Sequence, residues 1–164
     1  MSSFNRRTFL LAIPATALTG CGFTPAYGPS GAATRLQNAI LVDEPKTRDA
    51  FLLTQNIEDR LGRASNPRYG LSYAITTRDN AIAITAANVT NRFNLEGAVT
   101  YTLRDLQTGA VVTTGKVNSF TSYSASGSTV ATQAAERDAR TRLMSILSDQ
   151  IITRLIAASP GLSA

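Results

Sequence analysis

The chain has 164 residues, a formal net charge of +5 and a single cysteine, and it contains no histidine. The absence of histidine removes the commonest general base and the commonest metal ligand. Its basic residues form no run interleaved with aromatic residues, which argues against nucleic acid as a partner. The composition therefore favours a protein that is not an enzyme and that binds neither a metal ion nor another cofactor.

The first 20 residues have the three parts of a secretory signal. Arg6 and Arg7 form a positive n-region, and residues 9–18 form a short apolar h-region. The segment Leu18-Thr19-Gly20-Cys21 then places a leucine three positions before a cysteine, with small residues between them. This is the lipobox pattern, in which signal peptidase II cuts before a cysteine that carries a diacylglycerol. We predict a signal peptide over residues 1–20 and lipidation of Cys21.

Lipidation would leave residues 21–164 as a mature chain anchored to a membrane. The h-region is too short for a retained transmembrane helix, which needs about 20 apolar residues. Gly22 follows the cysteine, where an aspartate would favour retention in the inner membrane. We therefore expect an outer-membrane protein on the periplasmic face. A stray free cysteine is the simpler alternative, and the pair Arg6-Arg7 leaves Sec or twin-arginine export open.

The mature chain begins with a segment rich in Pro, Gly and Ser, so residues 21–36 predict a flexible tether. A single domain over residues 37–159 and a tail over residues 160–164 follow. In the domain, a short apolar run at residues 39–42 predicts a strand.

A first helix is expected over residues 48–61, where apolar positions recur on one face. Thr47 predicts its N-cap, and Asp49 lies favourably in its first turn. Gly62 predicts the C-terminal stop.

From Tyr69 onward the hydrophobic period changes to two, which predicts strands. Residues 69–77 form the first of these, and Arg78-Asp79-Asn80 predicts a turn or bulge. The clearest strand covers residues 92–104, where apolar side chains alternate with polar ones. Such alternation indicates a sheet with one buried and one wet face.

A hairpin loop is predicted over residues 105–109, followed by a strand over residues 110–123 with a bulge at Gly115. A long helix over residues 130–158 has an apolar stripe. Four alanines make its first half slim enough to pack closely on a sheet: Ala131, Ala134, Ala135 and Ala139.

The predicted order is β-α-β-β-β-α. One apolar sheet face and two apolar helical stripes need to cover each other, so we expect the α+β class. The architecture would be a two-layer sandwich, a mostly antiparallel sheet packed by two helices.

The mature N-terminus carries a family resemblance. The run Cys21-Gly22-Phe23-Thr24-Pro25-Ala26-Tyr27-Gly28 resembles the start of mature LptE, the lipopolysaccharide-assembly lipoprotein, in its alphaproteobacterial form. The order of predicted elements is similar to that family across the whole mature chain.

The resemblance implies a non-catalytic outer-membrane lipoprotein that sits as a plug inside the LptD β-barrel. It also implies a role in assembling that barrel and in delivering lipopolysaccharide to the outer leaflet. Basic residues on the sheet bind lipopolysaccharide in the family, and Arg92 and Lys116 fall near those positions. An ordinary solvated role on a strand surface is the alternative for both residues.

Two other functions stay open at this point. One is a different periplasmic lipid-trafficking lipoprotein, such as an auxiliary subunit of an ABC transporter. The other is a hydrolase that uses carboxylates alone, which would need two Asp or Glu side chains facing each other in a cleft at about 5–10 Å.

Overall fold

The computed structural model describes residues 28, 31–84 and 90–159, so the predicted signal peptide and Cys21 lie outside the described residues. The described elements follow in this order: α2 (Ala32–Leu36), β1 (Ile40–Val42), α3 (Arg48–Leu61), β2 (Tyr69–Ile84), β3 (Thr90–Asp105), β4 (Val111–Ser124) and α4 (Thr129–Ala158). Among the described residues, no helix has both the length and the apolar character needed to cross a membrane.

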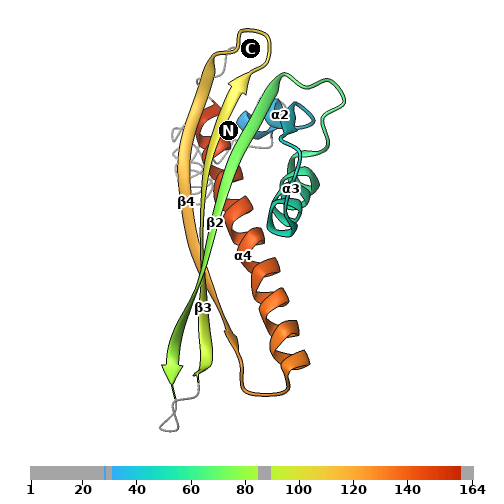
Figure 1. Cartoon of the computed structure of the whole chain (residues 1–164). Coiled ribbons are helices and arrows are strands. Elements are labelled where there is room, and N and C mark those ends of the chain that lie inside the picture. Colours follow the sequence, from blue (N-terminus) through green and yellow to red (C-terminus); the bar gives the residue numbers. More distant parts are fainter. Residues whose placement is uncertain (1–27, 29–30, 85–89, 160–164) are drawn as a thin grey trace, which may run out of the picture.

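The four strands form one sheet in the order β1-β2-β3-β4. Strand β1 is parallel to β2, because α3 carries the chain back between them, and the other pairs are antiparallel. Helices α3 and α4 lie side by side on one face of the sheet, as Figure 1 shows. The α+β prediction of a mostly antiparallel sheet packed by two helices is confirmed.

Helix α3 has the ends that its sequence predicts. The hydroxyl of Thr47 accepts a hydrogen bond from the backbone N–H of Ala50 at 3.1 Å. At the other end, Gly62 has a φ of 79° and donates its N–H to the carbonyl of Glu58. A positive φ suits glycine because it has no Cβ.

The core lies between the sheet and α4. The helix buries a continuous stripe, made up of Leu143, Met144, Leu147, Ile151, Ile152 and Leu155. Opposite it, the inward-facing strand residues include Leu71, Leu95, Val99, Leu103 and Val117. Gly97 allows the two layers to approach closely, since a Cβ at this position would lie 2.9 Å from Leu143.

Two predicted irregularities of the sheet are in the wrong place. Residues Arg78, Asp79 and Asn80 do not form a turn, because β2 continues through them to Ile84. The pairing instead shifts just beyond, where Ala81 pairs with Phe93 and Ala83 with Arg92, so that Ile82 is the extra residue. That bulge changes the parity of the hydrophobic pattern.

Gly115 is not a bulge, since it pairs in register with Tyr101. The irregularity in β4 lies nearer its start, between the pairs that Leu103 and Arg104 form.

The folded part begins earlier than the predicted boundary at residue 37. Residues 32–36 form the short helix α2 rather than tether, and it buries Ala33 and Leu36 in the core. The first turns of α4 do not pack closely on the sheet as predicted. Ala131 and Ala134 are exposed there, and Val130 is 74% exposed. Two turns further on, Ala139 is fully buried, and its carbonyl accepts a hydrogen bond from the hydroxyl of Thr121 in β4.

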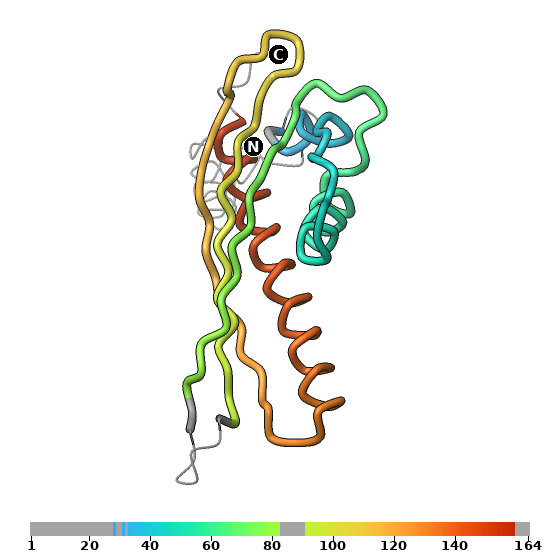
Figure 2. The backbone as a smooth tube through the Cα atoms, in the orientation of Figure 1, coloured from blue at the N-terminus to red at the C-terminus, as the bar shows by residue number. Residues whose placement is uncertain are grey.

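Figure 2 shows how strongly the long strands twist along their length. The end of β2 and the start of β3 lie at the same end of the molecule as the start of α4. Helix α2 and the β3–β4 hairpin lie at the opposite end. The sheet therefore has two distinct ends and, on the side away from the helices, one long open face.

Candidate functional site

The open face of the sheet carries the even-numbered residues of β2 as far as Asn80, those of β3, and those of β4 from Thr114 onward. The register shift near the start of β4 also places Val111, opposite Arg104, on this face. The register places them side by side, since even residues of β2 pair with even residues of β3, and these pair with even residues of β4. Both packing helices lie on the other face (Figure 1). Most of these outward side chains are polar or charged, as the alternation in residues 92–104 predicts.

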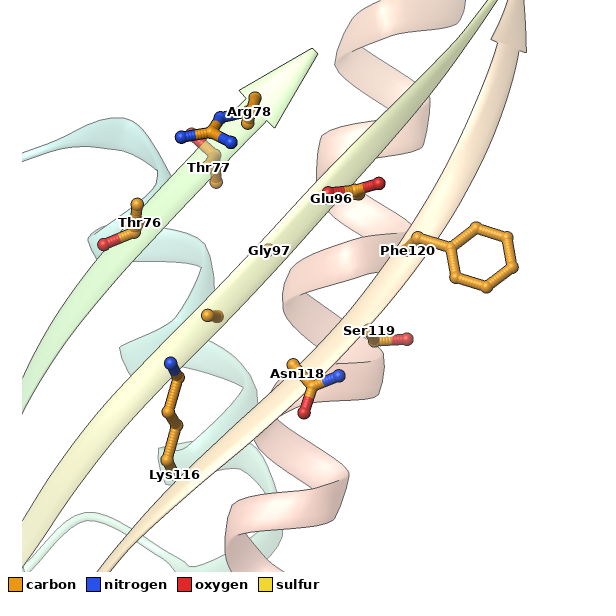
Figure 3. A pocket seen from close by; sticks show the side chains of 10 residues that line it. Thr76, Thr77, Arg78, Glu96, Gly97, Lys116, Asn118, Ser119 and Phe120 are labelled. Atoms are coloured by element: carbon orange, nitrogen blue, oxygen red, sulfur yellow. The ribbon is translucent and has the colours of Figure 1, made fainter. Parts of the chain in front are cut away.

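A hollow of about 690 Å³ lies on the open face near the middle of the sheet. Its lining residues come from three strands: Thr76, Thr77, Arg78, Glu96, Gly97, Ala98, Lys116, Asn118, Ser119 and Phe120. Figure 3 shows the arrangement, with Arg78 on β2, Glu96 on β3 and Lys116 on β4. The Lys116 side chain extends over β3, so the two cations approach the hollow from opposite sides.

Both cations of the hollow are exposed. Within the described part of the chain, neither Arg78 nor Lys116 forms an ion pair. Glu96 pairs with Arg78 in the sheet register, and it is the one carboxylate among the lining residues. A guanidinium and an ammonium without fixed partners can each accept an anionic oxygen of a ligand.

The hollow also has an apolar rim. Phe120 is 62% exposed and pairs with Glu96. Figure 3 shows its ring extending from β4 on the side away from β3. Cationic groups beside an exposed aromatic ring suit an amphiphilic ligand that has both anionic and apolar parts.

The structure does not bring the two sequence-predicted site residues together. Arg92 pairs with Ser124, and Lys116 pairs with Thr100, so they lie eight residues apart along β3. At about 3.4 Å per residue this separates them by about 27 Å. They share the open face, but Lys116 lies at the hollow and Arg92 lies near the far end of the sheet.

Lys116 is the one lining residue that the sequence predicts as a site residue, and Arg78 and Phe120 are the two others whose chemistry suits a ligand. Arg78 was hidden because Arg78-Asp79-Asn80 looks like a turn. The alternation of Leu71, Tyr73 and Ile75 was the available signal, since its continuation places Arg78 on the wet face.

Two arginines of α4 donate hydrogen bonds to the edge strand of the sheet. Arg154 donates to the backbone carbonyl of Lys116 at 2.7 Å, and Arg142 donates to that of Ser122 at 3.4 Å. Both carbonyls belong to β4, the last strand of the sheet, whose backbone groups on that side have no neighbouring strand. These arginines hold the helix against the sheet and are not part of the hollow.

Three carboxylates do gather elsewhere, around Arg140 of α4. Its guanidinium contacts Glu136 at 3.0 Å, Asp79 at 3.2 Å and Asp49 at 3.3 Å. Burial, Asp79 and Glu136 together raise the pKa of Tyr123, whose hydroxyl donates to Asp79. Because all three carboxylates share one guanidinium, the cluster joins α3, β2 and α4 as a structural clamp.

Three solved structures that resemble this fold bear the name lipoprotein. A candidate lipoprotein from Caulobacter crescentus CB15 is 24% identical, with a TM-score of 0.67, and the match covers 79% of this chain and 97% of that one. Rare lipoprotein B from Shewanella oneidensis is 10% identical with a TM-score of 0.54, covering 73% of this chain and 92% of that one. A minor lipoprotein from Acinetobacter baumannii is 21% identical with a TM-score of 0.52, covering 73% and 89%. At these identities the likeness shows the fold alone.

A sequence match to a protein-family model identifies the family of this chain. Residues 36–155 match the family described as LptE: Lipopolysaccharide-assembly, which is well over half of the chain. The chain therefore belongs to the LptE family of lipopolysaccharide-assembly lipoproteins. No curated protein matches it.

Proposed function

We propose that this chain is the lipoprotein partner of an LptD β-barrel in the outer membrane. In this role it would bind lipopolysaccharide on the open face of its sheet during delivery to the outer leaflet. The observation that carries the proposal is the combination of family membership with an open sheet face on which Arg78 and Lys116 form no ion pair with any described residue. Cys21 would carry the lipid anchor, as its lipobox predicts.

Lipid A phosphates are the anionic groups that the hollow would bind. Arg78 can form two parallel hydrogen bonds to one phosphate, and Lys116 can act as a point charge for another. Phe120 would contact an acyl chain or the sugar beside them. Arg92, at about 27 Å from Lys116 along the strand, would be a separate contact on the same face.

The rest of the open face is suited to a position inside the barrel, where the chain would act as a plug. The lumen of a large outer-membrane barrel is polar and wet. The rows beyond the hollow carry Ser, Thr and Asn side chains, such as Ser72, Thr102, Thr114 and Asn94. Such a face can lie against a polar barrel wall without burying unpaired apolar surface.

A binding measurement with a double charge reversal tests the site. The chain from residue 22 onward would be titrated with lipopolysaccharide, and Arg78→Glu with Lys116→Glu should weaken binding at least about tenfold, which is about 1.4 kcal/mol. Binding of the unaltered chain should also weaken as salt rises, because exposed charge pairs are screened. Arg92→Glu alone should have a smaller effect, since that residue is far from the hollow.

The matched control reverses two cations elsewhere. Arg48→Glu with Arg137→Glu changes the net charge equally, and both residues are exposed on helices, away from the open face. Neither forms an ion pair among the described residues, so folding should survive. Equal losses in the two double variants would mean that overall charge alone matters, and the site would be withdrawn.

A further inference from the structure

One end of the open face carries a group of exposed aliphatic side chains. Across all four strands, one row of paired residues runs Leu41, Gly70, Arg104 and Val111. Leu106 from the β3–β4 hairpin lies over Gly70, since a Cβ there would be 3.0 Å from its side chain. We call Leu41, Arg104, Leu106 and Val111 the end row.

The aliphatic side chains of the end row are unusually open to solvent. Leu41 is 51% exposed, Leu106 is 48% exposed and Val111 is 55% exposed. The next row along the sheet is instead polar, with Ser72, Thr102 and Thr114 paired across the strands and joined by hydrogen bonds. Three exposed aliphatic side chains around one arginine therefore mark this end of the face.

The end row lies at the end of the molecule where the described chain begins. Helix α2 leads directly into β1, with Ala39 donating its N–H to the carbonyl of Leu36. Gly28 accepts hydrogen bonds from the N–H of Gly31 and the hydroxyl of Thr34, so it lies at the start of α2. Figure 1 shows α2 and the β3–β4 hairpin at the same end of the fold.

The tether between this end and the anchor is short. Gly28 lies seven positions after Cys21. Fully extended, such a segment spans at most about 25 Å. A lipid on Cys21 would therefore keep the end row close to the membrane surface, whereas the opposite end of the 30-residue helix α4 would be held about 45 Å further along the helix axis.

We propose that, in the lipidated chain before it joins the barrel, the end row docks on the phospholipid surface to which the anchor attaches. Leu41, Leu106 and Val111 enter the boundary between headgroups and acyl chains, and Arg104 remains among the lipid phosphates. The contact orients the domain, with the β3–β4 hairpin at the membrane and the far end of the sheet pointing away from it. This inference rests on the proposed lipidation of Cys21.

Quenching by brominated lipids tests the contact on the full lipidated chain. The protein would be reconstituted in vesicles of phosphatidylethanolamine and phosphatidylglycerol, with a bimane label at Gln107→Cys in the hairpin loop or at Gln133→Cys near the start of α4. Both positions are exposed. Since docked apolar residues lie about 5–10 Å into the boundary, brominated lipid should reduce fluorescence at position 107 at least about twofold and leave position 133 nearly unchanged.

Two further variants separate docking from simple proximity. Leu106→Glu with Val111→Glu should lower quenching at position 107 to the level at position 133. The control Thr100→Glu with Asn118→Glu adds the same charge on polar rows of the same face and should leave quenching intact.

Vesicle flotation is measured alongside. A protein that floats but shows no quenching at position 107, or equal quenching at both positions, overturns the docking of the end row and leaves the anchor standing. A protein that does not float overturns the lipidation of Cys21 and the docking together. Quenching that persists in the Leu106 and Val111 double variant shows proximity without contact and also overturns the proposal.

Discussion

Gly115 illustrates how one residue shapes the inner face of the sheet. The ring of its partner Tyr101 lies across it, so that a Cβ at this position would be 2.6 Å from the Tyr101 hydroxyl and 2.8 Å from Cζ. An aromatic ring held in a core cannot move aside as the end of an aliphatic chain can. The glycine is therefore required by close approach, although its backbone is an ordinary strand.

Gly115→Val should lower the free energy of unfolding by about 1–3 kcal/mol, the usual cost of overpacking. Urea unfolding would measure it. Gly127→Ala is the control, because the nearest atom to its added Cβ is Ala131 Cβ at 3.6 Å, an ordinary contact. If the two variants lose the same free energy of unfolding, the close approach of Tyr101 does not exclude a side chain at position 115.

Asp105 sets the hairpin that bears part of the end row. The backbone N–H of Thr108 donates to its carboxylate at 2.9 Å and lowers the pKa of Asp105, with further lowering by Gln107 and Arg68 against the opposing effect of burial. Since the pKa is lower in the folded state, the stabilisation is full above the ordinary value of about 3.9. It is lost as the pH falls through the lower folded value.

Asp105→Asn should therefore be less stable than the unaltered chain at pH 7, and the difference should shrink as the pH falls below about 4. Asparagine keeps an acceptor oxygen, so the comparison isolates the charge. Melting curves at several pH values would show it. The exposed Asp59→Asn serves as the control, and a constant difference for Asp105→Asn across this range would contradict the assignment.

At the scale of elements, the Arg140 clamp connects three segments that are distant in the sequence. Asp49 lies in the first turn of α3, Asp79 lies in β2 and Glu136 lies one turn before Arg140 in α4. Phe93 and Tyr123 stack beside it across β3 and β4, with ring centroids 5.3 Å apart. Removing the single cation would leave three carboxylates facing one another.

Arg140→Gln should lower the free energy of unfolding by about 1–2 kcal/mol, since its charged hydrogen bonds are only partly open to solvent. Arg60→Gln, which removes the pair with Asp149, should cost less than about 0.5 kcal/mol. The side chains of that pair are 58% and 45% exposed, so water already screens it. If chemical unfolding shows comparable losses of unfolding free energy in both variants, the clamp contributes no more stability than an exposed ion pair.

The elements themselves were largely predictable because their signals are local. Thr47 and Gly62 mark the ends of α3, and the leucine and isoleucine stripe of α4 marks its buried face. The parallel pairing of β1 was not predictable, since three residues carry too little pattern. The sequence predicts this irregularity at residues 78–80 rather than at Ile82, because a turn and a bulge change the parity of the hydrophobic pattern in the same way.

The hollow was less predictable than the strands that form it. Lys116 was found from the family resemblance, but its place opposite Arg78 depends on the register of three strands. A shift of one residue would move either side chain to the other face. The separation of Arg92 from Lys116 likewise follows from register and strand length, which alternation alone does not fix.

At the scale of the whole molecule, three surfaces have different proposed roles. The helices cover one face of the sheet, the hollow occupies the middle of the open face, and the end row lies at one end of that face. We propose that the end row meets the membrane before the chain joins the barrel, and that within the barrel the hollow binds lipopolysaccharide and the polar remainder lies against the wall. Each role follows from the chemistry of the side chains on that surface.

The central claim is that this chain works with an LptD barrel on lipopolysaccharide. The most direct test is to capture the full chain from outer-membrane extract and identify its partners by mass spectrometry, with lipopolysaccharide measured in the same eluate. We predict the LptD barrel in near-equal amount to the chain, together with lipopolysaccharide. Capture of subunits of an inner-membrane ABC transporter, with no LptD barrel in the eluate, would contradict the account.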